Sequence, residues 1–173
     1  MKKYLLAIKS KKGFSLVEML IYMGLFSIIL TSLMQLFGSI LDVKFESEAT
    51  SAVTQDGRYI ISRLTYDIHQ ADLIDSPSLG NQAPTLHITG SGMDYTYSLD
   101  GDNNLQISDN LASPTTVNQL NSADTTVSNL SFTTLGNTTG KKTVQVSLDV
   151  KSKVLRRGEN QIETFKTTIG TRQ

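Results

Sequence analysis

The chain has 173 residues, with 16 basic and 16 acidic side chains and a formal net charge of zero. A chain of this length can form one modest domain in addition to an anchor. It contains no cysteine, which excludes disulfide bonds, thiol catalysis and cysteine-based zinc sites.

The basic residues are unevenly distributed along the chain. Five lysines precede residue 13, and without them 11 basic residues face 16 acidic ones, which leaves a net charge near −5. Binding of nucleic acid by a basic groove relies on clustered lysine and arginine side chains. We therefore expect no direct nucleic acid binding by this chain.

A long apolar stretch follows these lysines, and we call residues 14–41 the apolar segment. It holds one carboxylate, Glu18, and from Met19 to Leu41 no side chain is charged at neutral pH. About 20 apolar residues suffice for a helix to cross a bilayer, whereas the core of a secretory signal peptide has only about 7–15. A carboxylate costs roughly 2.5–3.5 kcal/mol at the bilayer centre and less near the surface. Two interpretations remain open, namely a plain anchor with Glu18 at headgroup level, or a glutamate that has a partner.

Lysine placement predicts the orientation of this single membrane span. All five early lysines precede it, whereas Asp42, Lys44, Glu46 and Glu48 follow it. By the positive-inside rule the N-terminus stays on the cytoplasmic side and the rest of the chain is extracytoplasmic. We expect a single-pass protein of the bacterial inner membrane, with lipid around the apolar segment.

The junction between the lysines and the apolar segment reads KKGFSLVE at residues 11–18. This motif resembles the N-terminus of type IV prepilins and pseudopilins. The resemblance implies that residues 1–13 are a leader, that a prepilin peptidase cleaves between Gly13 and Phe14, and that the new amine of Phe14 is methylated. It also implies that Glu18 neutralises this amine on a neighbouring pilin subunit, with an inner-membrane assembly platform as a further partner. Two physical arguments support this role of Glu18. A carboxylate is stabilised at the positive N-terminal end of a helix, and a buried ammonium needs a counter-charge.

Beyond the apolar segment, residues 42–76 keep a helical period. Apolar residues recur at helical steps, with polar residues on the other faces: Val53, Ile60, Leu64, Ile68 and Ala71. This pattern predicts an amphipathic continuation of the helix, which we expect to end near Asp75 because Ser76-Pro77 follows. The run at residues 63–71 also resembles J-type pseudopilins and W-type minor pilins.

Residues 77–173 change to a period of two, which predicts strands. Residues 93–99 alternate, turn at 100–104 and continue at 105–107 as a hairpin, and further strands are expected at 130–135, 144–150 and 162–169. We expect residues 108–128 to be an exposed connection with little regular structure. The predicted fold is therefore α+β and type IV pilin-like, with the helix packed on one small antiparallel sheet.

One segment of this predicted β region could hold a metal. Asp100, Asp102 and Asn104 offer oxygen ligands at alternate positions, as the start of a calcium loop does, but Leu111 takes the place of the usual final glutamate. A hairpin turn explains the same residues. We find no other metal set, no cofactor motif and no catalytic constellation, so we expect neither a cofactor nor an enzyme.

The sequence thus predicts a minor pilin or pseudopilin. It would be a structural subunit of a type IV pilus, a type II secretion pseudopilus or a competence filament, exposed at the cell surface after assembly. The alternative is an uncleaved, single-span anchored protein whose extracytoplasmic part is a binding module.

Overall fold

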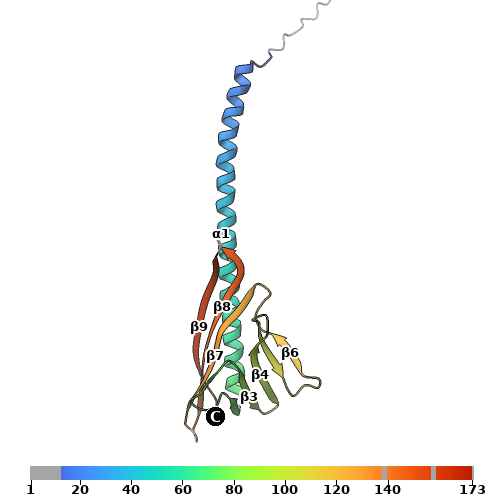
Figure 1. The fold of residues 1–173 in the computed structure, drawn as a ribbon, viewed down its shortest axis with the longest axis vertical. Helices are drawn as coiled ribbons and strands as arrows, with labels where there is room; N and C mark the ends of the chain where they lie inside the picture. The colour runs from blue at the N-terminus through green and yellow to red at the C-terminus, as the bar shows by residue number, and fades with distance from the viewer. Residues whose placement is uncertain (1–12, 138–139, 157–158, 173) are drawn as a thin grey trace, which may run out of the picture. The chain divides into compact units, whose positions relative to one another are not determined.

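The computed structural model describes residues 13–137, 140–156 and 159–172. The chain divides into two compact units, Met1–Asp42 and Val43–Gln173, and we call the second unit the head. The described residues of the first unit form the beginning of helix α1 (Leu16–Gln70). The same helix continues into the head (Figure 1). The long N-terminal helix is therefore confirmed.

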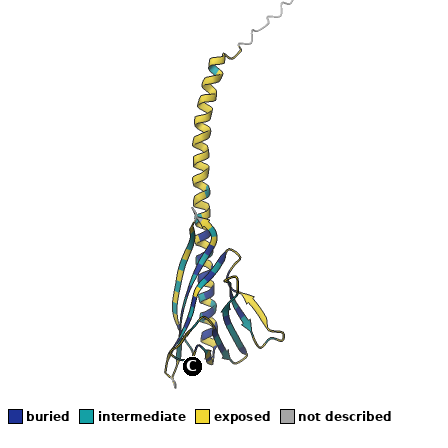
Figure 2. Cartoon of the chain, in the orientation of Figure 1, coloured by how far each residue is buried: buried dark blue, intermediate teal, exposed yellow. Residues whose placement is uncertain are grey.

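Within the head, helix α1 buries one face against strands. Its buried residues follow three- and four-residue steps, which is the spacing of one helical face: Ala49, Val53, Asp56, Gly57, Ile60, Leu64, Asp67 and Ile68. Figure 2 shows these buried positions in dark blue, whereas the apolar segment is almost entirely exposed. The predicted amphipathic stripe is thus confirmed, and it contains two aspartates that the apolar pattern does not include.

The remaining regular structure of the described head consists of strands in two antiparallel sheets. Their bounds are β1 (Leu73–Ser76), β2 (Gln82–Ala83), β3 (Leu86–Gly90), β4 (Met93–Leu99), β5 (Leu105–Asp109), β6 (Thr116–Gln119), β7 (Thr125–Gly136), β8 (Lys142–Arg156) and β9 (Glu159–Gly170). One sheet has the order β1-β3-β4-β5-β6 and the other the order β2-β7-β8-β9. The prediction of a single sheet was wrong, because alternation marks strands but does not say which strands pair.

One hydrophobic core joins the helix to both sheets. It includes Leu64 of α1, Tyr97 of β4 and Val146 of β8, each fully buried. The cleanest alternation in the sequence, at 144–150, puts four consecutive inward positions of β8 at zero exposure. The α+β class with a helix packed on antiparallel strands is therefore confirmed.

The helix ends at Gln70 and not near Asp75, which corrects the predicted boundary of 76. The N–H of Asp72 donates to Thr89 O at 2.9 Å, and Leu73 and Ile74 pair with β3. Ile74 is buried in this ladder. Ile74 also fits the helical period that ends at Ala71. Periodicity could therefore not distinguish a longer helix from a strand at this position.

The segment 108–128 is also more ordered than predicted. It contains β6 and the start of β7, and Leu120, Asn121 and Thr125 are buried. Its two buried polar residues, Asn121 and Thr125, are hydrogen-bonded, whereas all four residues of β6 are exposed. For example, Asn121 Oδ1 accepts the Leu105 N–H at 2.8 Å and Asn121 Nδ2 donates to Thr125 O at 2.9 Å.

Candidate functional site

The predicted processing junction, Gly13–Phe14, lies just ahead of helix α1. Phe14 is 72% exposed, and a Cβ placed on Gly13 would have no neighbour within 4 Å. Residues 1–12, the rest of the expected leader, lie outside the described residues. Both residues of the predicted junction are therefore accessible in the described chain, as a protease substrate requires.

Glu18 lies in the first turn of α1, where the helix dipole favours a negative charge. One of its oxygens, Oε1, accepts a hydrogen bond from the Tyr22 hydroxyl at 3.1 Å. The Tyr22 ring also contacts the Phe14 ring edge-on, with centroids 6.3 Å apart. The structure therefore gathers Phe14 and Glu18 with a third residue that was not predicted to belong to the site, although its i+4 spacing from Glu18 could have revealed it.

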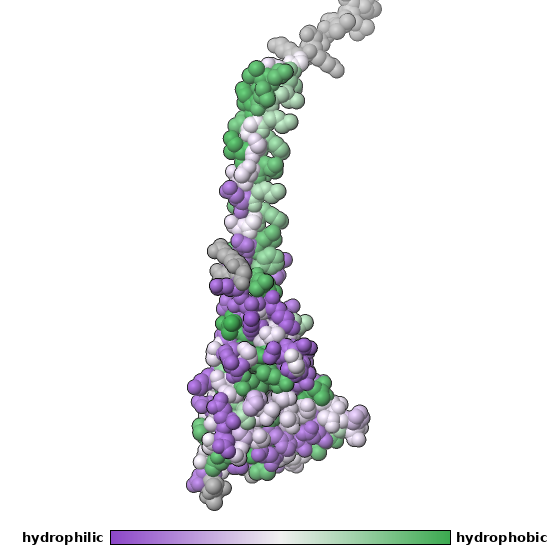
Figure 3. All heavy atoms as spheres, in the orientation of Figure 1, coloured by the Kyte–Doolittle hydropathy of each residue, from purple (hydrophilic) through white to green (hydrophobic). Residues whose placement is uncertain are grey.

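The apolar segment buries none of its large side chains within the chain. Figure 3 shows this hydrophobic surface in green along the first unit, and most of its large apolar residues are more than half exposed. Four of its hydroxyl groups are satisfied within the helix, because those of Ser27, Thr31, Ser32 and Ser39 donate to carbonyls three or four residues earlier. A helix with satisfied backbone and hydroxyl groups suits lipid or another apolar helix. Within the described residues, α1 is the one helix long and apolar enough to cross a membrane.

The calcium candidates form the β4–β5 hairpin turn. Asp100 Oδ1 accepts the backbone N–H groups of Asp102 and Asn104, both at 2.8 Å, and Oδ2 accepts the side-chain amides of Asn104 and Gln106 at 2.9 and 3.0 Å. These bonds, led by the one from the Asn104 backbone, hold the pKa of Asp100 below its ordinary value. The turn thus occupies the carboxylate, as the hairpin alternative predicts, and whether calcium binds there stays an untested prediction.

Two buried carboxylates of α1 connect the helix to the rest of the head. Asp56 Oδ2 accepts hydrogen bonds from Ser122, through both its N–H and its hydroxyl, and from the Thr125 hydroxyl. Asp67 Oδ2 accepts from Arg63 Nε at 2.7 Å and from the Tyr97 hydroxyl. Neither carboxylate was predicted to be buried, because the apolar residues alone define the predicted stripe. Asp56 and Asp67 follow Val53 and Leu64 at a helical step, and this spacing is the sequence feature that could have revealed their burial.

Tyr97 gives the head a pH dependence. Burial, and next its hydrogen bond to Asp67, raises the pKa of Tyr97 far above its ordinary value of 10.0. A raised pKa in the folded state contributes stability that is complete below the unfolded pKa, about 10, and is lost as the pH rises above it. We expect the urea midpoint to fall between about pH 9 and pH 11, and to fall less in Tyr97→Phe, which has no phenol to ionise at this position. If the urea midpoint fell equally with pH in the wild type and in Tyr97→Phe, this assignment would be contradicted.

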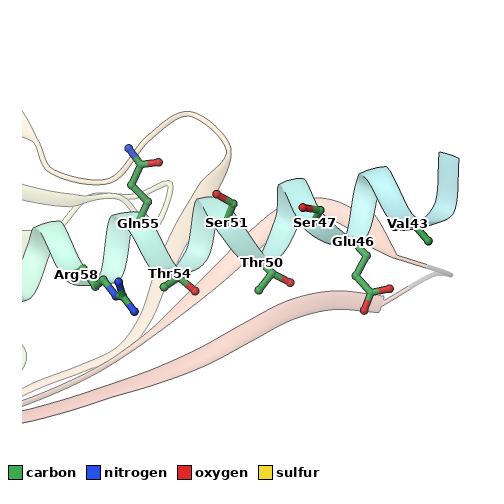
Figure 4. A pocket seen from close by; sticks show the side chains of 8 residues that line it. All are labelled: Val43, Glu46, Ser47, Thr50, Ser51, Thr54, Gln55 and Arg58. Carbon is green, nitrogen blue, oxygen red and sulfur yellow. The ribbon is translucent and has the colours of Figure 1, made fainter. Parts of the chain in front are cut away.

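A groove of about 720 Å³ runs along α1 in the head, lined by Val43, Glu46, Ser47, Thr50, Ser51, Thr54, Gln55 and Arg58 (Figure 4). Figure 4 shows that its side chains leave the helix on two sides, with Thr54 and Glu46 directed towards the neighbouring strands. Thr54 donates to Glu163 of β9 at 3.0 Å. The lining offers hydroxyl groups, the Glu46 carboxylate and the Arg58 guanidinium, and it contains no histidine, cysteine or lysine.

Comparison with known proteins bears on the N-terminal motif alone. No curated protein and no solved structure matches the chain. The J-type and W-type resemblances therefore stay predictions. The apolar helix and the motif together support a single-pass anchor in the inner membrane, and the motif points to a structural subunit. Residues 8–34 match the family described as the prokaryotic N-terminal methylation motif, which supports a type IV pilin-like precursor and is consistent with the prepilin and pseudopilin family.

Proposed function

We propose that this chain is a minor pilin or pseudopilin, a filament subunit that is made as a membrane-anchored precursor. The observation that carries the proposal is the uncovered apolar helix, whose first part lies within the methylation motif. Prepilin peptidase removes residues 1–13 and methylates the amine of Phe14. The cytoplasmic lysines keep the N-terminus inside, so the head is extracytoplasmic.

The exposed apolar segment needs other apolar groups to cover it, and this requirement explains assembly. Before assembly lipid covers it, and in the filament the helices of neighbouring subunits cover it by packing side by side. Glu18 then faces the amine of Phe14 on a neighbour, and the pair forms in a setting with little water. Such a pair is favourable only if both charges are present and well placed, so Glu18 sets the axial register of the subunit.

The N-terminus of the protein isolated from its own cells tests the proposal. Mass spectrometry should find a mature chain that begins with N-methylated Phe14. An intact Met1 terminus in cells that carry the peptidase would contradict the proposal. It would favour the uncleaved anchored binding module instead.

Glu18→Ala tests the pairing. The variant should insert and be cleaved normally, because neither step uses the charge pair, but about one-tenth or less of the normal amount should enter filaments, since the neighbour's buried ammonium is left unpaired. Quantitative immunoblots of the filament and membrane fractions measure this ratio. Glu48→Ala is the matched control, because Glu48 forms an exposed pair with Lys44 at 3.6 Å, and such a pair contributes little. Normal assembly of Glu18→Ala would show that the pairing role is wrong.

A further inference from the structure

Three residues at four-residue intervals lie on one side of the start of α1: Phe14, Glu18 and Tyr22. Side chains of a helix tilt towards its N-terminus, so the Tyr22 side chain lies over the preceding turn. This brings its hydroxyl to 3.1 Å from Glu18 Oε1 and its ring edge-on to Phe14, at an interplanar angle of 75°. Glu18 is half-buried as a result, whereas the large residues around it are exposed.

Glu18 has few other donors within reach. Among the described residues its side chain forms one hydrogen bond, to Tyr22, and the first basic residue in that part of the chain is Lys44, more than six helical turns away. A carboxylate in a water-poor environment is costly unless it is hydrogen-bonded. Tyr22 is 52% exposed, and its hydroxyl would itself lack a partner in lipid without Glu18. Each group therefore satisfies the other in the single subunit.

A carboxylate can accept hydrogen bonds on both oxygens. Tyr22 occupies Oε1 and leaves Oε2 open for a second donor. The contact with Phe14 restricts the tyrosine ring, and the ring in turn restricts the glutamate side chain, which otherwise has three rotatable bonds. The cost of ordering Glu18 is thereby met before a neighbour arrives.

We infer that Tyr22 is a positioning residue for the assembly contact. Its hydroxyl holds Glu18 through Oε1 and presents Oε2 to the N-terminal amine of the neighbouring subunit. The inference rests on the proposed function, because it assumes that Glu18 meets that amine. It differs from the simpler role of an interfacial tyrosine, whose ring alone would anchor the helix in the membrane.

Tyr22→Phe separates the two roles, because it keeps the ring and its contact with Phe14 and removes only the hydroxyl. In the full chain, expressed in its own cells, we expect normal insertion and cleavage with about tenfold less chain in filaments, which is the lower end of the effect of losing one hydrogen bond to a charged group. Tyr66→Phe, which removes the same atom from an exposed tyrosine of the head, is the matched control and should assemble normally.

The double variant Glu18→Ala/Tyr22→Phe decides whether Tyr22 acts through Glu18. We expect it to assemble like Glu18→Ala alone, to within about a factor of two, because the hydroxyl has nothing left to position. If Tyr22→Phe reduced filament incorporation equally in the wild type and in Glu18→Ala, the inference would be overturned. A failure of Tyr22→Phe to be inserted or cleaved would overturn it as well. Normal assembly of Tyr22→Phe beside an impaired Glu18→Ala overturns the inference and leaves the proposed function standing. Normal assembly of Glu18→Ala overturns the pairing itself.

Discussion

Replacing Asp67 with alanine is expected to lower the free energy of unfolding of the head by about 3 kcal/mol. Asp67 is 2% exposed and accepts hydrogen bonds from Arg63 and from Tyr97, which is fully buried. Its removal leaves the Tyr97 hydroxyl without an acceptor in the core, and such a group costs about 1–3 kcal/mol. Arg63 is partly exposed and can turn to solvent, so most of the loss comes from the stranded Tyr97 hydroxyl. Urea denaturation of the full chain in detergent, followed by near-ultraviolet circular dichroism, measures the change.

Two further variants test this explanation. Asp67→Asn keeps an acceptor for Tyr97 and should lose less than the alanine variant. Adding Tyr97→Phe to Asp67→Ala removes the stranded hydroxyl, so the double variant should be less destabilised than the sum of the single ones. Asp102→Ala, at the exposed hairpin turn, is the control and should stay within about 0.5 kcal/mol. A loss for Asp67→Ala no larger than for this control would contradict the anchoring role of Asp67.

The regular parts of the fold were predictable because they depend on local repetition. The stripe of α1 and the alternation of β8 both put apolar residues on one side, and burial of that side is the main driving force of folding. Which strands pair with one another could not be predicted from local repetition. The hairpin of β4 and β5 is local, whereas β1 joins β3 by a ladder that begins where the helix ends, and only the packed core favours strand over helix at Ile74.

The buried polar contacts were harder still to predict from sequence. Asp56 meets Ser122 and Thr125, which lie more than sixty residues further along the chain. A polar residue is expected to be exposed until its partner is known, because burial without a hydrogen bond is unfavourable. The methylation motif is the opposite case, since its residues are contiguous and can be recognised without the fold. Tyr22 lies between these cases, because its partner is only one helical turn away.

Gly57 shows how packing can reverse an interpretation of sequence. A glycine within a helix lowers its stability by roughly 1 kcal/mol relative to alanine, which by itself suggests a place for bending. In the structure a Cβ on Gly57 would lie 2.1 Å from the Phe165 ring of β9. The absent side chain therefore lets β9 approach α1 closely, whereas a Cβ on Gly24 or Gly38 of the apolar segment would have no neighbour within 4 Å.

Gly13→Val is expected to abolish processing, with roughly a hundredfold less mature chain than wild type, the loss that follows when a scissile bond is misplaced in a protease site. The head should be unaffected, because a Cβ on Gly13 would have no neighbour within 4 Å and this glycine lies outside the core. Without cleavage the amine of Phe14 never forms, so Glu18 has no counter-charge to meet and assembly should fail as well. Immunoblots of the membrane fraction separate the precursor from the mature chain, and mass spectrometry identifies its terminus.

Gly38→Val is the matched control for this variant. It makes the same change in the apolar segment, at a position that also has no neighbour within 4 Å, and it should be inserted and cleaved normally. If Gly38→Val were also left uncleaved, the defect would lie in membrane insertion and not at the junction. Normal cleavage of Gly13→Val would place the processing site elsewhere, and the amine that Glu18 is proposed to meet would then not belong to Phe14. The proposed cleavage site and the proposed charge pair therefore depend on each other, because cleavage after Gly13 would create the charged amine that Glu18 is proposed to neutralise.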